Sequence, residues 1–209
     1  MRAGFFRLIR DLHLYIGLFI SPFVILFSVT VFFLAYSWLP RIGSETSNTR
    51  IVSAFLLPEN LASLSGRALI DALKPGLERA GVQGEVGFVR HLIKEEKLII
   101  PVIIPGRVTT VSVSITNREA TIVARETGLA EAMVTLHQSP GPHGPAIRMN
   151  WVYMMVWRWM ADATVYLILF ISLSGVYLWY ALRAERSVGF FLLFAGALSL
   201  FGLAYALSR

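Results

Sequence analysis

The sequence contains no cysteine among its 209 residues, which excludes disulfide bonds, thiolate chemistry and iron–sulfur ligation. It also has no internal repeat, no low-complexity tract and no glycine-rich phosphate loop. The spacing of its serines, histidines and aspartates suggests no catalytic triad, and none of its long apolar stretches contains a pair of carboxylates. The sequence therefore argues against an enzyme that acts alone and against a proton carrier.

Three stretches of the chain are long, apolar and free of formal charge. They comprise 28 residues at Leu12–Leu39, 20 residues at Ala163–Leu182 and 20 residues at Val188–Leu207. A helix rising about 1.5 Å per residue crosses a hydrocarbon core of roughly 30 Å with about 20 residues. We therefore predict three transmembrane helices with the lipid bilayer as a partner. The first stretch is about twice as long as a usual signal-peptide core, which favours an uncleaved anchor.

Arginines flank these stretches at two places. They precede the first stretch and occupy the short turn between the second and the third: Arg2, Arg7, Arg10, Arg183 and Arg186. The positive-inside bias places such residues in the cytoplasm. We therefore predict a cytoplasmic N-terminus and an extracytoplasmic location for residues of about 40–150.

The polar block of residues 40–150 is nearly balanced in charge. It carries 12 basic and 10 acidic residues, a balance of +2, whereas the whole chain carries +6. The basic excess therefore reflects the membrane flanks more than a nucleic-acid surface, which would need a basic stripe. We predict no nucleic-acid partner.

The polar block has the pattern of one helix followed by strands. Apolar residues recur at intervals of three and four over Ser65–Ala80, Gly81 ends this helix, and Pro75 is expected to kink or divide it. Turn residues separate four strand-like runs, as in an antiparallel meander. These runs are Glu85–Ile93, Lys97–Ile104, Val108–Ile115 and Ala120–Arg125.

One face of the predicted sheet is apolar. Val111 and Val113 alternate with Ser112, which predicts one packed face and one wet face, and the helix is expected to cover the packed one. Pro101 predicts a bulge or an edge in its strand. The predicted fold class is an α+β membrane protein. Its expected parts are the cytoplasmic N-terminus and first transmembrane helix at 1–39, the extracytoplasmic domain at 40–148 and a transmembrane helical hairpin at 149–209.

Three motifs give the chain a resemblance to a known family. In Arg10–Leu18 a basic residue, a Leu-His pair and a Gly-Leu pair lead into the first span. Leu136-His137 precedes the second span, and Leu173–Trp179 combines a small residue and a glycine with an aromatic-rich end. In this order and spacing they resemble PepSY-associated transmembrane proteins. The block of a helix and strands between them resembles a PepSY domain.

The resemblance implies a multi-pass protein of the bacterial inner membrane with the polar block in the periplasm. Larger members of this family look like proteins of iron and siderophore handling, and some are haem-containing ferric–siderophore reductases. Many small members have no assigned activity. This chain has three predicted spans rather than four or more, and few histidines in them, which weakens the case for an electron path across the membrane.

The histidines are candidate ligands of a b-type haem, which needs two imidazoles at one membrane depth. His13 lies at the predicted cytoplasmic mouth of the first helix, while His137 and His143 precede the second span on the opposite side. Within one chain His137 can pair only with His143, and His13 needs a partner from another subunit. The competing interpretations are an interfacial His13 bonded to a phosphate or a backbone carbonyl, and a solvated loop around His137 and His143.

The segment of residues 136–145 is rich in proline and glycine, which predicts a stiff loop that joins the domain to the second span. Its two histidines are six residues apart and have no carboxylate nearby in sequence, which is a weak metal signature, so we predict no metal site. His91 alternates on a predicted strand among polar neighbours and is interpreted as surface.

Arg158 and Asp162 are spaced i to i+4, so they share one helix face and are predicted to pair. Trp151, Trp157 and Trp159 mark the outer membrane interface around them. The pair is interpreted as an anchor that fixes helix tilt. The alternative is that Arg158 contacts a partner subunit or a haem propionate.

Two functions therefore compete. The first is a non-catalytic accessory subunit, whose PepSY-like domain docks to or supports a membrane redox or metal-uptake complex through other subunits or through self-association. The second is a haem-b electron-transfer protein of ferric–siderophore reduction. The lack of a catalytic constellation favours the accessory function.

Overall fold

The computed structural model describes residues 3–36, 46–139, 147–183 and 185–208. The chain forms two compact units. One unit combines Met1–Pro22 with Ala163–Arg209, and the other is Phe23–Asp162. Two of the long helices, α1 and α4, have residues in both units.

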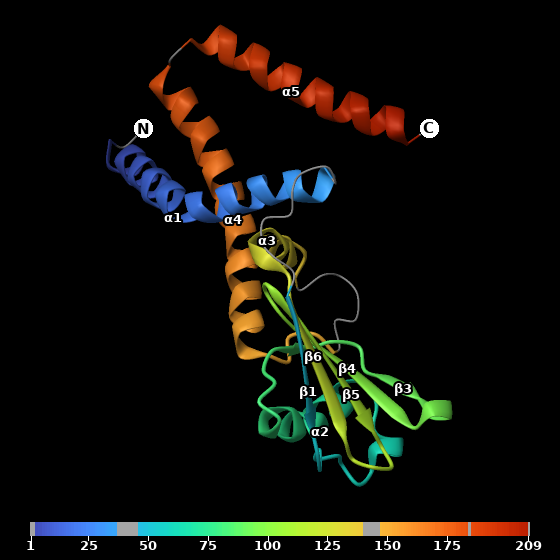
Figure 1. Ribbon diagram of the computed structural model, residues 1–209. Coiled ribbons are helices and arrows are strands. Elements are labelled where there is room, and N and C mark those ends of the chain that lie inside the picture. The colour runs from blue at the N-terminus through green and yellow to red at the C-terminus, as the bar shows by residue number, and fades with distance from the viewer. Residues whose placement is uncertain (1–2, 37–45, 140–146, 184, 209) are drawn as a thin grey trace. The chain divides into compact units, whose positions relative to one another are not determined.

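Within the described residues, three helices are long and apolar enough to cross a membrane (Figure 1): α1 (Ala3–Ala35), α4 (Val152–Leu182) and α5 (Arg186–Leu207). They confirm the prediction of a multi-pass membrane protein. Helix α4 begins earlier than its uncharged stretch, so Arg158 and Asp162 lie inside the helix.

Six strands form one antiparallel sheet, which together with the helices gives the predicted mixed α+β class. The order of strands along the sheet is β1-β6-β5-β4-β2, and β3 pairs with β4 on the same side as β2. The strands are β1 (Thr46–Val52), β2 (Glu85–Val86), β3 (Arg90–Leu92), β4 (Lys97–Ile104), β5 (Arg107–Ser114) and β6 (Ala120–Glu126). We call Thr46–Glu126 the sheet domain.

The first predicted run, Glu85–Ile93, is two short strands rather than one. The interruption lies opposite Pro101 of β4, whose carbonyl oxygen accepts the N–H of Gly87 at 2.8 Å. The N–H and C=O of a strand residue point to the same side of the strand. Proline has no N–H, so Pro101 offers no donor to the neighbouring strand at this interruption. The predicted bulge or edge in the strand of Pro101 is therefore wrong: β4 pairs with β5 in unbroken register, and the interruption falls in the neighbouring strand instead.

Helix α2 (Gly66–Arg79) covers the apolar face of the sheet, as predicted. It continues through Pro75, so the expectation of a divided helix is wrong. Pro75 and Asp71 are exposed, and water can bind the carbonyl of Asp71 that loses its N–H partner. Gly81, at φ +67°, ends the helix, and the N–H of Val82 bonds back to the carbonyl of Leu77.

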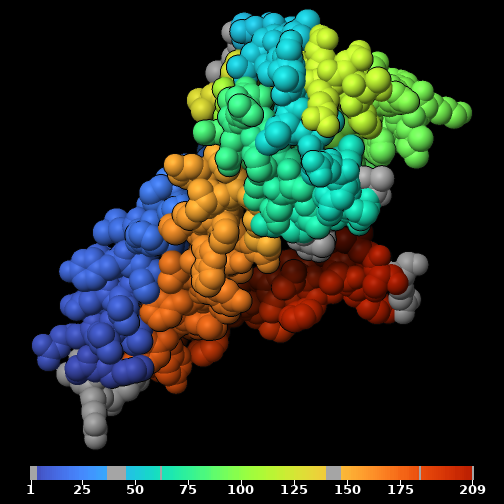
Figure 2. Space-filling view, turned by 90° about the horizontal axis from the view of Figure 1, so that it is seen from below, coloured from blue at the N-terminus to red at the C-terminus, as the bar shows by residue number. Residues whose placement is uncertain are grey.

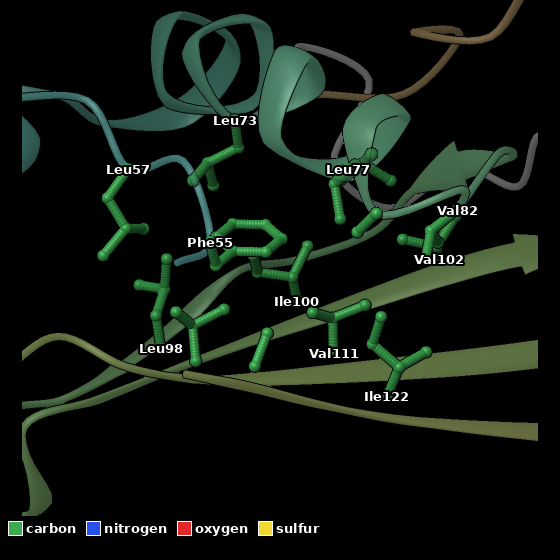
Figure 3. Close-up of a cluster of buried hydrophobic side chains, with 14 of the residues drawn as sticks. Phe55, Leu57, Leu73, Leu77, Val82, Leu98, Ile100, Val102, Val111 and Ile122 are labelled. Carbon is green, nitrogen blue, oxygen red and sulfur yellow. The ribbon is translucent and has the colours of Figure 1, made fainter. Parts of the chain in front are cut away.

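A single apolar core lies between α2 and the sheet, and Figure 3 shows its side chains pointing from both layers toward one another. Leu73 of α2 and Ile100 of β4 are both 0% exposed. Gly76 permits close packing, because a Cβ there would collide with the carbonyl oxygen of Leu56. The buried set is Phe55, Leu57, Ile70, Leu73, Leu77, Ala80, Val82, Val86, Leu98, Ile100, Val102, Val111, Val113, Ala120 and Ile122.

The sequence analysis did not predict β1 or α3 (Gly128–Gln138). Strand β1 pairs with β6 along its whole length, and its residues are exposed except Val52. Helix α3 includes Leu136 and His137, so the predicted loop over residues 136–145 is wrong for its first three residues. Residues 140–145 of that loop lie outside the described residues.

In the unit of Met1–Pro22 and Ala163–Arg209, α1 and α4 run antiparallel. The rings of Phe5 and Tyr177 meet edge to face at 5.8 Å, and further along α1 Gly17 faces Ile171. At Gly196 and Gly202 of α5, a Cβ would meet no described atom within 4 Å.

Candidate functional site

A buried polar contact of the sheet domain joins β2 to the segment that leads into α4. Glu85 is only 3% exposed, and its carboxylate accepts backbone N–H groups from three consecutive residues. They are Met149, Asn150 at 3.4 Å and Trp151 at 3.0 Å. Free N–H groups and a positive partial charge make the beginning of a helix a site for a carboxylate. Glu85 therefore fixes the segment that leads into α4.

Asn150 makes a second link to the same strand. Its side-chain oxygen accepts the N–H of Val86 at 3.0 Å, and its side-chain NH2 donates to the carbonyl of Val86 at 2.7 Å. Val86 stands opposite Val102 at the position where β2 points its backbone groups away from β4. The Asn150 amide thus takes the place of a neighbouring strand and closes this part of the sheet edge. We call Glu85, Val86 and residues 149–151 the junction.

Burial raises the pKa of Glu85, since the charged carboxylate loses its hydration. The three N–H donors and the nearby charge of Arg148 act in the opposite direction. Arg148 is itself tied to the domain, because Arg67 of α2 donates to its carbonyl at 3.2 Å. The junction is therefore a dense polar network with a charge that nearby donors only partly compensate.

A cavity of about 340 Å³ lies beside the junction. Its wall includes Lys74 and Glu78 of α2, Gly84 before β2, and Asn150 and Trp151 before α4. Figure 2 shows the first turns of α4 directly against the sheet domain on this side. A group bound in this cavity would touch both the domain and the segment that enters α4.

A second polar contact connects α3 with the C-terminal part of α1. Thr30 is 0% exposed, and its hydroxyl donates to the carbonyls of Leu26 and Phe27, both at 2.9 Å. The same oxygen lies 2.6 Å from Nδ1 of His137. The Thr30 hydroxyl and Nδ1 of His137 thus share one hydrogen bond, whose direction depends on the imidazole tautomer.

Aromatic contacts surround His137. Its ring meets the ring of Phe27 edge to face at 5.3 Å, and the indole N–H of Trp157 donates to the carbonyl of Leu136 at 2.9 Å. The predicted solvated loop at His137 is therefore wrong. The physical reason is that α3 presents this histidine to α1, where the hydroxyl of Thr30 binds it.

His13 makes a similar contact in the other unit. Its Nδ1 lies 2.8 Å from the hydroxyl of Ser174, which in turn donates to the carbonyl of Ile171 at 3.2 Å. The imidazole approaches Gly175 closely, where a Cβ would lie 3.5 Å from its Cε1. The expected bond to a phosphate or a backbone carbonyl is thus replaced by a bond to a hydroxyl on α4.

The other predicted residues have different positions. Arg158 pairs with Asp162 at 3.4 Å, as predicted, and also donates to the sulfur of Met149 at 3.1 Å. His91 is exposed on β3, in agreement with its interpretation as surface. His143 lies outside the described residues.

The described histidines do not complete a haem site within either unit. His13 is the one histidine of its unit, and β3 with His91 lies well apart from α3 with His137 (Figure 1). A b-type haem would therefore need an imidazole from His143 or from a second chain. Among the described residues no group of three or more His, Cys, Asp or Glu side chains is suited to hold a metal ion.

In comparisons with known proteins, no family model, curated protein or solved structure matches this chain. Its function must therefore be inferred from its own residues.

Sequence reasoning missed Glu85 and Asn150. One signal was available, because Asn immediately before a long apolar and aromatic run is typical of a helix start. Nothing in the sequence marks Glu85, which has the appearance of an ordinary charged residue at the start of a strand.

Proposed function

We propose that this protein is a non-catalytic accessory subunit of a bacterial inner-membrane complex. Its sheet domain, PepSY-like and periplasmic in this proposal, docks to or supports a redox or metal-uptake complex. The observation that supports this function best is the junction, because a carboxylate and an amide tie the domain directly to the start of α4. A domain held in this way presents one defined orientation to a neighbouring membrane subunit.

The cavity beside the junction supports the same function. It is bounded by apolar side chains such as Val82 and Val102 and by the charges of Lys74 and Glu78. Concave surfaces with a few convergent polar groups are typical binding sites. A side chain from a partner subunit would enter here and touch the domain and the α4 segment together.

We expect the Asn150→Ala variant to lose most of its bound partner. The change opens the β2 edge and loosens the domain from α4, while the core between α2 and the sheet is untouched. Affinity purification of the tagged full chain from native membranes, followed by quantitative mass spectrometry, measures the partner per chain. We expect at least a fivefold decrease, which corresponds to about 1 kcal/mol of binding free energy.

Asn60→Ala is the matched control, since Asn60 is an exposed asparagine of the same domain whose side chain makes no capping hydrogen bond. It should retain the partner of the wild-type chain. An equal loss in both variants would argue against a role for the junction. Reduction of a ferric chelate at a useful rate by the purified chain alone would contradict the accessory function.

One observation favours haem-b electron transfer as a second candidate. At both His13 and His137 a hydroxyl lies within hydrogen-bond distance of Nδ1, and a contact of this kind orients a histidine ligand. Such a site would take its second imidazole from another copy, and Arg158 would be available to a propionate. The chemistry supplied by haem would be one-electron transfer.

An absorbance spectrum of the detergent-purified chain, before and after dithionite, separates the two candidates. The accessory function predicts no Soret band and no haem in the pyridine haemochrome assay. One haem per chain or per dimer would instead support electron transfer. In that case His137→Ala should abolish the band, whereas His91→Ala, at an exposed position, should leave it unchanged.

A further inference from the structure

An apolar cleft of about 560 Å³ opens between α4 and α5 at the turn that joins them. The two helices diverge from this turn (Figure 1). Val176 and Trp179 of α4 form one wall, and Val188 and Leu192 of α5 form the other. Glu185 is the one charged residue of the lining.

Two glycines and an indole give the cleft its shape. Gly189 of α5 lies directly against the Trp179 ring, where a Cβ would collide with the indole. The Trp179 ring also meets Phe190 edge to face at 5.3 Å. Gly175, on the α4 wall, has no side chain that would fill the cleft. The indole is thus fixed between the two helices, and the cleft stays open beside it.

A basic group lies in the turn beside the cleft, next in sequence to Glu185 of the lining. Arg186 lies one helical turn before Gly189, and its guanidinium carbon is 4.6 Å from the centre of the Tyr180 ring. One terminal nitrogen donates to the carbonyl of Tyr180 at 3.1 Å, while the buried Nε has no hydrogen-bond partner among the described residues. The exposed Arg183 belongs to the same turn. The guanidinium of Arg186 is therefore held in place with donors to spare.

The turn is the end of two membrane-spanning helices, so it lies at the level of the lipid headgroups whichever way the chain is inserted. A ligand of this site must be apolar along its length and anionic at one end. We propose that the cleft binds one anionic phospholipid, with an acyl chain between Trp179 and Leu192 and the phosphate at Arg186. Basic pockets between transmembrane helices bind anionic headgroups in this way.

Glu185 makes it possible to test whether charge at the turn determines lipid binding. Its carboxylate lines the cleft and is exposed, so it repels an anionic headgroup that Arg186 attracts. Neutralising Glu185 and neutralising Arg186 should therefore change lipid retention in opposite directions. A purely apolar cleft would respond to neither substitution.

The test is native mass spectrometry of the full-length chain, purified in detergent with equal amounts of phosphatidylglycerol and phosphatidylcholine. We expect the wild-type chain to retain phosphatidylglycerol in preference. Arg186→Gln should reduce that preference about fivefold and Glu185→Gln should raise it by a similar factor, the effect of about one unit charge near a membrane surface. Arg10→Gln is the control, because Arg10 is exposed, pairs with Asp11 and belongs to α1 rather than to the turn between α4 and α5.

Leu192→Trp tests the apolar part of the site. A larger side chain at this half-open position fills the cleft, and we expect retention of both lipids to fall. Soluble glycerol phosphate in excess should not displace the lipid, since it lacks the acyl chain. Displacement by glycerol phosphate, or equal retention of both lipids by the wild-type chain and by Arg186→Gln, would overturn the proposal.

The wild-type chain could instead form a dimer without bound lipid, and Leu192→Trp could abolish that dimer. This outcome would show that a second copy covers the cleft, and it would also overturn the lipid proposal. All variants are compared as the monodisperse fraction with the helix content of the wild-type chain. Because Glu185 is exposed and Glu185→Gln changes only surface charge at the turn, at least one folded variant is available to decide the outcome.

Discussion

Replacement of Leu73 by alanine should lower the free energy of unfolding of the sheet domain by about 3–4 kcal/mol. Leu73 is completely buried at the centre of α2 and faces the strands across the core (Figure 3). A Leu→Ala change in a packed core loses apolar burial and leaves a cavity, which typically costs about 2–5 kcal/mol. Pulse proteolysis of the full-length chain in detergent over a urea series measures this change.

Ile93→Ala is the matched control for this core prediction. Ile93 is an aliphatic residue of the same domain, but it is 78% exposed, so its truncation should change the unfolding free energy by less than about 0.5 kcal/mol. If Leu73→Ala were as resistant to urea as Ile93→Ala, the helix would not depend on the core for its position on the sheet.

Replacement of Glu85 by alanine should destabilise the domain by about 2–4 kcal/mol and release the start of α4. The change leaves the N–H groups of buried Asn150 and of partly buried Met149 and Trp151 without their acceptor. An N–H group that water does not reach then costs about 1–3 kcal/mol. Hydrogen exchange of residues 147–152 in the full-length chain should become much faster. The same urea series gives the loss of stability.

Glu95→Ala separates this effect from a general loss of negative charge. Glu95 is exposed and makes only a surface ion pair with Lys97, so we expect neither faster exchange near α4 nor a measurable loss of stability. Unchanged exchange at residues 147–152 in Glu85→Ala would contradict the role of this carboxylate in the junction.

The membrane helices could be predicted from the sequence because their signal is local. A run of about 20 apolar residues without charge has few other stable environments, and no tertiary contact is needed to recognise it. The same is true of α2 and of the long strands β4, β5 and β6, whose apolar periodicity is strong. The bounds of α4 were less accurate, because Arg158 and Asp162 interrupt the apolar run without interrupting the helix.

The elements that the sequence did not reveal depend on distant partners. Strand β1 begins with Thr-Ser-Asn-Thr and has no apolar alternation, and it forms because β6, some seventy residues later, supplies its hydrogen bonds. Helix α3 immediately precedes a segment rich in proline and glycine. Because that composition predicts a loop, the end of α3 was assigned to the loop. Such elements depend on tertiary context more than on intrinsic preference.

The candidate site shows the same division. Sequence spacing correctly predicted the Arg158–Asp162 pair, since i and i+4 positions of a helix are neighbours. The links of Glu85 and Val86 to residues 149–151 join positions about 65 residues apart, and the contact of His137 with Thr30 joins positions 107 apart. No local pattern contains such distances, so the junction was visible only in the folded chain.

The junction also sets the order in which the protein can be completed during synthesis. The ribosome makes the chain from the N-terminus, so every strand of the sheet exists before residues 149–151 emerge. Until then the carboxylate of Glu85 has no N–H donors from this segment, and the outer side of Val86 is open. The sheet edge closes only when the first turn of α4 follows, so maturation of the domain coincides with entry of the second membrane helix.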